Sequence, residues 1–153
     1  MANARKQPAA QKPLKLDFES VEQVLVVPEN EDRFITTERE AARACQVAEY
    51  GKEWSNQFKD FLSYIHHWCE EHSAIVEAGF VDVGDIGLRV EICINKDSYD
   101  FEFDDEITDL DVELGKRFPS CIAEATQIPK QDLLRDAYMS EHVMRVYGNS
   151  TST

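Results

Sequence analysis

The sequence predicts a single α+β domain, a two-layer sandwich in which a three-stranded antiparallel meander and a further strand pack against two to four helices. Three observations predict this class. The chain has 153 residues, the usual size of one domain, and 42% of them are hydrophobic, which is enough for a packed core. Apolar residues recur every three or four positions between Trp54 and Cys69, as in a helix. They recur every second position between Ile75 and Phe103, as in strands.

The N-terminal part of the chain divides at residue 14. Residues 1–13 contain two prolines and no apolar period, so we expect a flexible basic arm, followed by the folded domain over residues 14–148. The last residues, 149–153, predict a disordered tail. From 14 to 27 the pattern fits either a strand or a short helix, which leads into a loop at 28–32.

Two helices are expected next. Thr37 and Glu40 have the spacing of a capping box, so they predict a helix over about residues 37–50, with Gly51 as its C-cap or as a bend. The following segment has the strongest periodicity in the chain. Its aromatic residues at helical spacing indicate a core stripe rather than a cofactor-binding box. The stripe consists of Trp54, Phe58, Phe61, Leu62, Ile65, Trp68 and Cys69.

The second half of the chain predicts the sheet and two more helices. Turn compositions after residues 83 and 94 separate three expected strands, which would form the meander. Asp104 or Asp105 is expected to cap a helix that ends near Phe118, with Pro119 beyond its end. The expected strands cover 75–83, 88–94 and 99–103; a further strand is expected near 121–126 and a last helix over about 129–147.

The charge distribution limits the partners. The formal net charge is −14, and residues 1–15 hold four basic side chains and no acidic one, so the rest of the chain is more acidic still. Such a surface repels phosphates, which disfavours nucleic acids and anionic membranes and favours a basic or neutral protein or peptide. No apolar run reaches the length of a membrane span. The isolated cysteines Cys45, Cys69, Cys93 and Cys121 are expected to be reduced core residues of a cytoplasmic protein.

The most acidic segment, residues 97–113, has nine carboxylates and no Lys or Arg. In the expected strand, Asp100, Glu102 and Asp104 would form a row on one face. An EF-hand is excluded because Tyr99 would occupy a ligand position and Asp100 the required glycine, but weak divalent-cation binding stays open beside a purely solvated face. The predicted partner-binding residues are Asp97, Asp100, Glu102, Asp104, Asp105, Glu106 and Asp109.

A second cluster offers metal-binding chemistry. On a helix His66, Cys69 and Glu70 share one face and would supply three ligands, although the H-E-x-x-H pattern of zinc hydrolases is absent. The alternative is a helix end enriched in His because of the helix dipole. The sequence contains no nucleophile elbow, phosphate-binding glycine loop or dinucleotide fingerprint, so we assign no catalytic residue and expect no cofactor.

These patterns favour a non-enzymatic acidic binding or adaptor protein that recognises a basic partner through residues 97–113. The alternatives are a metal-binding protein or small hydrolase, and an acidic mimic of nucleic acid. In size, low isoelectric point and expected α-β-β-β-α order over residues 37–147, the chain also resembles the small acidic chaperones that hold secreted effector proteins in bacterial secretion systems. That resemblance concerns architecture without a shared motif, and it implies a homodimer.

Overall fold

The computed structural model describes residues 13–20, 23–26, 28–135 and 142–148 and confirms the α+β class. The predicted N-terminal arm, apart from Pro13, and the predicted tail lie outside these residues. The described part contains no helix that is long and apolar enough to span a membrane. Its strands are β1 (Leu14–Ser20), β2 (Gln23–Val26), β3 (Val76–Val83), β4 (Leu88–Ile94), β5 (Ala123–Pro129) and β6 (Met144–Tyr147), and its α-helices are α1 (Glu31–Ala44), α2 (Lys52–Glu71), α3 (Asp104–Arg117) and α4 (Lys130–Arg135).

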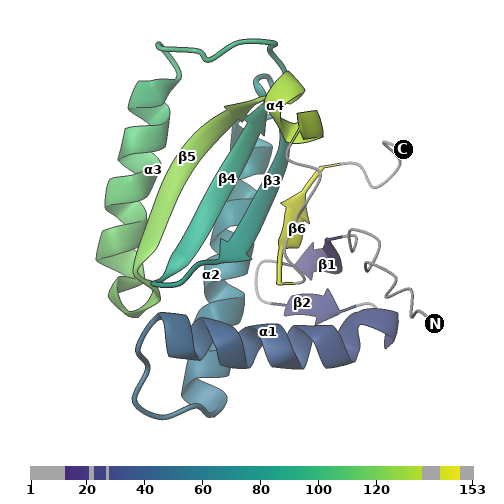
Figure 1. The fold of residues 1–153 in the computed structure, drawn as a ribbon, viewed down its shortest axis with the longest axis vertical. Coiled ribbons are helices and arrows are strands. Elements are labelled where there is room, and N and C mark those ends of the chain that lie inside the picture. Colours follow the sequence, from purple (N-terminus) through teal and green to yellow (C-terminus); the bar gives the residue numbers. More distant parts are fainter. Residues whose placement is uncertain (1–12, 21–22, 27, 136–141, 149–153) are drawn as a thin grey trace, which may run out of the picture.

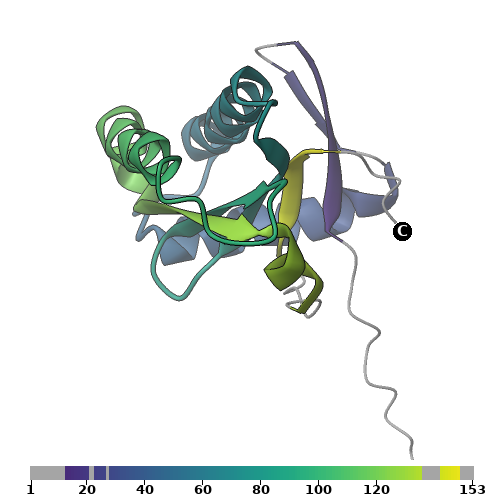
Figure 2. The same cartoon turned by 90° about the horizontal axis from the view of Figure 1, so that it is seen from above.

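The strands follow one another in the spatial order β2-β1-β6-β3-β4-β5 (Figure 1). The centre is the antiparallel hairpin β3–β4, in which Val81 lies opposite Val90. β5 adds to β4 in parallel, and β6 adds to β3 in antiparallel orientation. β1 pairs with β6 only at Leu14 and Lys15, and then leaves the main sheet to pair with β2 (Figure 2). The sheet is therefore mixed.

Helices α2 and α3 lie side by side on one face of the sheet (Figure 2). The predicted stripe of α2 is confirmed, because all seven of its residues are buried. The helix approaches the sheet very closely at Gly79 of β3, where an added Cβ would lie 2.7 Å from Sγ of Cys69. α1 crosses the lower end of the sheet in Figure 1 and packs on the start of α2, with the rings of Phe34 and Phe58 5.9 Å apart. Burial of this apolar face holds the two layers together.

The prediction for the first helix was wrong in its bounds. α1 begins at Glu31, directly after a 3-10 turn at Pro28–Asn30, so the expected loop at 28–32 is mostly helical. Thr37 does not cap the helix; it is fully buried within it, and its hydroxyl is 3.0 Å from Nδ1 of His142. The helix ends at Ala44, and Gly51 is the N-cap of α2 in extended conformation, not a C-cap.

The third strand of the expected meander does not form. Residues 99–103 make a turn before α3, and the place beside β4 is taken by β5 in parallel register. Asp100 causes this turn, because its Oδ1 accepts hydrogen bonds from the backbone N–H groups of Glu102 and Phe103, 3.0 and 3.1 Å away. Without the third strand, the α-β-β-β-α order behind the resemblance to secretion chaperones is absent.

The last predicted helix is also wrong. α4 covers only Lys130–Arg135, and the chain returns to the sheet as β6. Val143, Met144 and Val146 are buried there, and Met144 and Val146 alternate toward the core formed with α2. Residues 136–141 of the predicted helix lie outside the described part of the chain. The segment forms a strand because it pairs with β3 on one side and with β1 on the other.

The remaining boundary predictions hold more closely. α3 ends one residue before Phe118, with Pro119 just beyond, and β5 begins two residues after the expected start of its strand. Asp104 and Asp105 do not cap α3, since the N-cap is Phe103 and no side chain caps the helix there. One α3 carboxylate instead protects the outer strand: Oδ1 of Asp111 accepts the backbone N–H of Ala125 at 2.8 Å, which blocks part of the β5 edge.

Candidate functional site

The acidic segment lies in the loop after β4 and the first half of α3. The structure brings its carboxylates together at the N-terminal end of α3 rather than along a strand, so the predicted row formed by Asp100, Glu102 and Asp104 is wrong. Placement at a helix N-terminus is electrostatically favourable, because the backbone N–H groups there carry partial positive charge. The first turn contains Asp104, Asp105 and Glu106.

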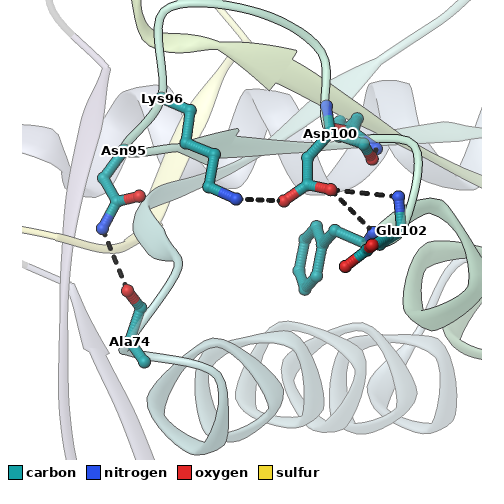
Figure 3. Close-up of polar contacts among 7 residues, drawn as sticks. Ala74, Asn95, Lys96, Asp100 and Glu102 are labelled. Carbon is teal, nitrogen blue, oxygen red and sulfur yellow. Dashed lines mark hydrogen bonds and ion pairs between the residues drawn. The ribbon is translucent and has the colours of Figure 1, made fainter.

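Asp100 organises the loop (Figure 3). One carboxylate oxygen receives the two backbone N–H groups of the turn, and the other forms an ion pair with the ammonium group of Lys96. The hydrogen bond from Lys96, together with those from the backbone of Phe103 and Glu102, lowers the pKa of Asp100 below its ordinary value. Asp100 therefore has a structural role in the loop, and its role in partner binding stays a prediction.

Side-chain amides hold the loop at two points, one on β5 and one on the turn between α2 and β3. Gln127 of β5 is buried and bonds the backbone of Asp100 twice: its Oε1 accepts the N–H at 3.0 Å and its Nε2 donates to the carbonyl at 2.9 Å. At the other end, Nδ2 of Asn95 donates to the carbonyl of Ala74 at 3.0 Å (Figure 3). These bonds fix the loop backbone before any partner arrives.

An aromatic pair projects from this fixed loop. The rings of Tyr99 and Phe101 are 4.9 Å apart, and the hydroxyl of Tyr99 donates a hydrogen bond to Asp104. That bond to a carboxylate raises the pKa of Tyr99 and keeps its hydroxyl protonated. Phe101 is 82% exposed, whereas Phe103, two residues later, is 4% exposed in the core. Together with Tyr99, which is 38% exposed, Phe101 forms a small exposed aromatic patch on hydrogen-bonded backbone.

The remaining predicted contact residues belong to the same loop and to the first half of α3. Asp104 is half-buried and holds Tyr99, while Glu106 lies 3.4 Å from Nε2 of His72. Within the described part of the chain, the other four form no ion pair with Lys, Arg or His. These four exposed carboxylates are Asp97, Glu102, Asp105 and Asp109. We call them, with Tyr99 and Phe101, the acidic-aromatic surface.

The sequence predicted the carboxylates of this surface but not its aromatic residues. Tyr99, Phe101 and Phe103 alternate with acidic residues, and because of this period of two, Phe101 was expected on the inner face of a strand. A local feature of the sequence contradicts a strand here. Asp100 accepts hydrogen bonds from the backbone N–H groups two and three residues later, which is the arrangement of an Asx-type turn. A cluster of acidic residues follows directly after this turn.

The predicted metal ligands are brought together only in part. His66 and Glu70 are adjacent, with Nε2 and Oε2 3.6 Å apart. Cys69 points into the core, fully buried against Gly79, and burial raises the pKa of its thiol, so it is unsuited as a ligand. His67 takes its place. In the described part of the chain, His66, His67 and Glu70 form a group whose ligand atoms all lie within 4.8 Å of one another.

A hollow of about 450 Å³ lies beside the start of α2. Its lining includes Cys45, Glu53 and Trp54. Sγ of Cys45 donates to the carbonyl of Cys121 at 2.9 Å, and burial raises the pKa of Cys45 to about 12. Because a thiolate rather than a thiol is the nucleophile, Cys45 is not activated for catalysis.

The thiols provide a test of the core. Burial raises the pKa of Cys121 to about 12 and of Cys93 to about 11, from an ordinary 9.0. The folded state therefore favours the protonated thiols, and the free energy of unfolding should fall as the pH rises above about 9, where unfolded thiols ionise. At a pH of about 8 we expect a thiol reagent to modify these cysteines only after denaturant is added. Rapid modification of the native protein would contradict their burial.

Comparison with protein-family models, with curated proteins and with solved structures gave no match for this chain.

Proposed function

We propose that the protein is a non-enzymatic binding protein that docks a basic, partly apolar segment of another protein on its acidic-aromatic surface. The observation that carries the proposal is Phe101, an 82% exposed aromatic ring on a loop fixed by hydrogen bonds, with Asp100 and Glu102 on either side of it in the sequence. Buried aromatic anchors dominate the binding energy of most interfaces. The ring supplies such an anchor, and the carboxylates around it select a partner with Lys or Arg.

The charge of the chain supports the same class of partner. A net charge of −14 attracts cationic segments over long range and repels acidic competitors, which raises the association rate at low salt. We also propose a reducing compartment such as the cytoplasm, and four buried, unpaired cysteines are consistent with it. A fixed loop also lowers the entropy lost on binding, because little backbone remains to be ordered.

The proposal is tested with a fluorescent synthetic peptide that alternates Lys or Arg with Leu, titrated with the protein in an anisotropy assay. We expect Phe101→Ala to weaken binding about tenfold, since this loses roughly 1.4 kcal/mol of anchor energy. The double charge reversal Asp105→Lys/Asp109→Lys should weaken peptide binding by a similar factor. Added salt should also weaken binding to the wild-type protein, because it screens the attraction between the carboxylates and the basic peptide.

Two control variants test whether peptide binding depends on the acidic-aromatic surface or only on the net charge and the exposed apolar area of the protein. Ile86→Ala removes another exposed apolar side chain, and Glu53→Lys/Asp60→Lys makes the same charge change on α2. Both controls should bind the peptide nearly as well as the wild-type protein. Equal losses in the controls and in the surface variants would show nonspecific attraction to a polyanion and would contradict the proposal. Binding that no variant changes would contradict it too.

A further inference from the structure

A second group of side chains lies outside the acidic-aromatic surface, on the last two turns of α2. His66, His67 and Glu70 are separated by one, three and four positions, so the carboxylate of Glu70 comes next to both imidazoles. Its Oε2 is 3.6 Å from Nε2 of His66, and its Oε1 is 3.0 Å from Nδ1 of His67. One carboxylate thus lies between two potential nitrogen ligands.

The contacts of His66 indicate which of its ring nitrogens donates to the backbone. Nδ1 of His66 is 2.6 Å from the carbonyl oxygen of Val146, and because a carbonyl only accepts, Nδ1 carries the hydrogen. Nε2 is then the nitrogen that faces Glu70. The ring plane is fixed as well, since it stacks on Phe18 with 4.3 Å between centroids and 6° between planes. A histidine that donates one N–H to a backbone carbonyl and presents its other nitrogen is the usual arrangement of a metal ligand.

His67 is held only by this cluster. Its Nδ1 bonds Glu70, whereas its Nε2 is buried and forms no hydrogen bond with the described part of the chain. A buried nitrogen without a partner is uncommon in folded proteins. Within the described part of the chain, His67 therefore has one polar contact, made by the nitrogen that faces Glu70.

The distances suit a metal ion better than a second hydrogen bond. The 3.6 Å from Nε2 of His66 to Oε2 of Glu70 is long for a hydrogen bond. Two ligands of a tetrahedral zinc ion, each about 2.0–2.1 Å from the metal, lie roughly 3.3 Å apart. A neutral imidazole that faced the carboxylate with its lone pair would be repelled, so the contact is favourable with a proton on Nε2 or with a metal ion between the two groups. Two imidazoles and one carboxylate are the ligands that ions of the zinc type prefer.

We propose that His66, His67 and Glu70 form a binding site for one divalent transition-metal ion of the zinc type. Three protein ligands leave the fourth position of a tetrahedral ion to water. The site takes His66 and Glu70 from the sequence pattern and replaces Cys69, which is buried in the core, with His67.

The test uses zinc chloride alone. Protein stripped with a chelator is titrated in the presence of a reductant by calorimetry, and the melting temperature is measured with and without zinc. We expect one ion per chain and a zinc-dependent rise in melting temperature, since a ligand that binds only the folded state stabilises it. His67→Ala and Glu70→Gln should each lower the affinity by roughly tenfold or more. Absence of stoichiometric zinc binding by the wild-type protein would overturn the proposal.

Two controls locate the ion. Glu71→Gln removes the neighbouring charge of the same helix and should leave zinc binding unchanged. Asp105→Lys/Asp109→Lys alters the acidic-aromatic surface and should also bind zinc normally. Zinc binding that survives in His67→Ala and Glu70→Gln, or that is lost in the α3 variant, would place the ion elsewhere and overturn the proposal. Circular dichroism of each variant verifies that it is folded.

Discussion

Replacement of Phe61 by alanine is expected to lower the free energy of unfolding by about 3–5 kcal/mol. Phe61 lies on the buried stripe of α2 with no exposed surface, and its ring meets Phe118 edge to face at 5.4 Å. Truncation removes the transfer energy of the ring and leaves a cavity between α2 and the end of α3. Urea unfolding, monitored by circular dichroism, measures the loss as a lower midpoint with an unchanged slope.

Phe101→Ala is the matched control for this variant. It removes the same atoms from a ring that is 82% exposed, so its free energy of unfolding should stay within about 0.5 kcal/mol of wild type. The two variants compare a phenylalanine buried in the core with one exposed on the surface. A loss below about 1 kcal/mol in Phe61→Ala, or equal losses in both variants, would contradict the assignment of α2 as the centre of the core.

Gly87→Ala is the second substitution with a large expected effect. Gly87 ends the turn between β3 and β4 with a φ of +78°, and a Cβ there would lie 2.0 Å from the carbonyl oxygen of Ile122. The left-handed backbone costs an L-residue about 1–2 kcal/mol, and the clash forces the start of β5 away from β4. We expect a total loss of about 3 kcal/mol, measured by thermal or urea unfolding.

Gly115 provides the control for that substitution. It lies in α3, and an added Cβ would meet nothing within 4 Å. Gly115→Ala should therefore raise the free energy of unfolding by about 0.5–1 kcal/mol, because alanine is the better helix former. A Gly87→Ala variant as stable as the wild-type protein would contradict the close packing of this turn against Ile122.

Local patterns predicted the parts of the fold that depend on local contacts. α2 and the β3–β4 hairpin appear where their periodicity placed them, since one face of each is buried along its whole length. The capping box at Thr37 failed because a buried threonine within a helix has the same sequence spacing. Its hydroxyl meets His142, 105 positions away, and no local pattern reports such a partner.

The strands that were missed or misplaced depend on distant partners. β6 is four residues long and is a strand because it fits between β3 and β1, which its own sequence does not reveal. The segment around Phe101 has the alternation of a strand, but Asp100 and Gln127 hold it as a turn. Charge counting therefore found the carboxylates of the candidate site, whereas the exposed aromatic ring required the structure. The homodimer stays a prediction.

The proposed binding surface is a fixed, acidic loop with an exposed aromatic pair, and its proposed partners are basic segments. The most direct test of this proposal is to map the alternating basic and apolar peptide on isotope-labelled protein by NMR. We expect backbone shifts to concentrate at residues 97–109, and we expect Phe101→Ala to raise the peptide concentration needed for half of these shifts about tenfold. Shifts that concentrate elsewhere, such as at the hollow beside Glu53 and Trp54, or that spread evenly over the acidic surface, would contradict the proposal.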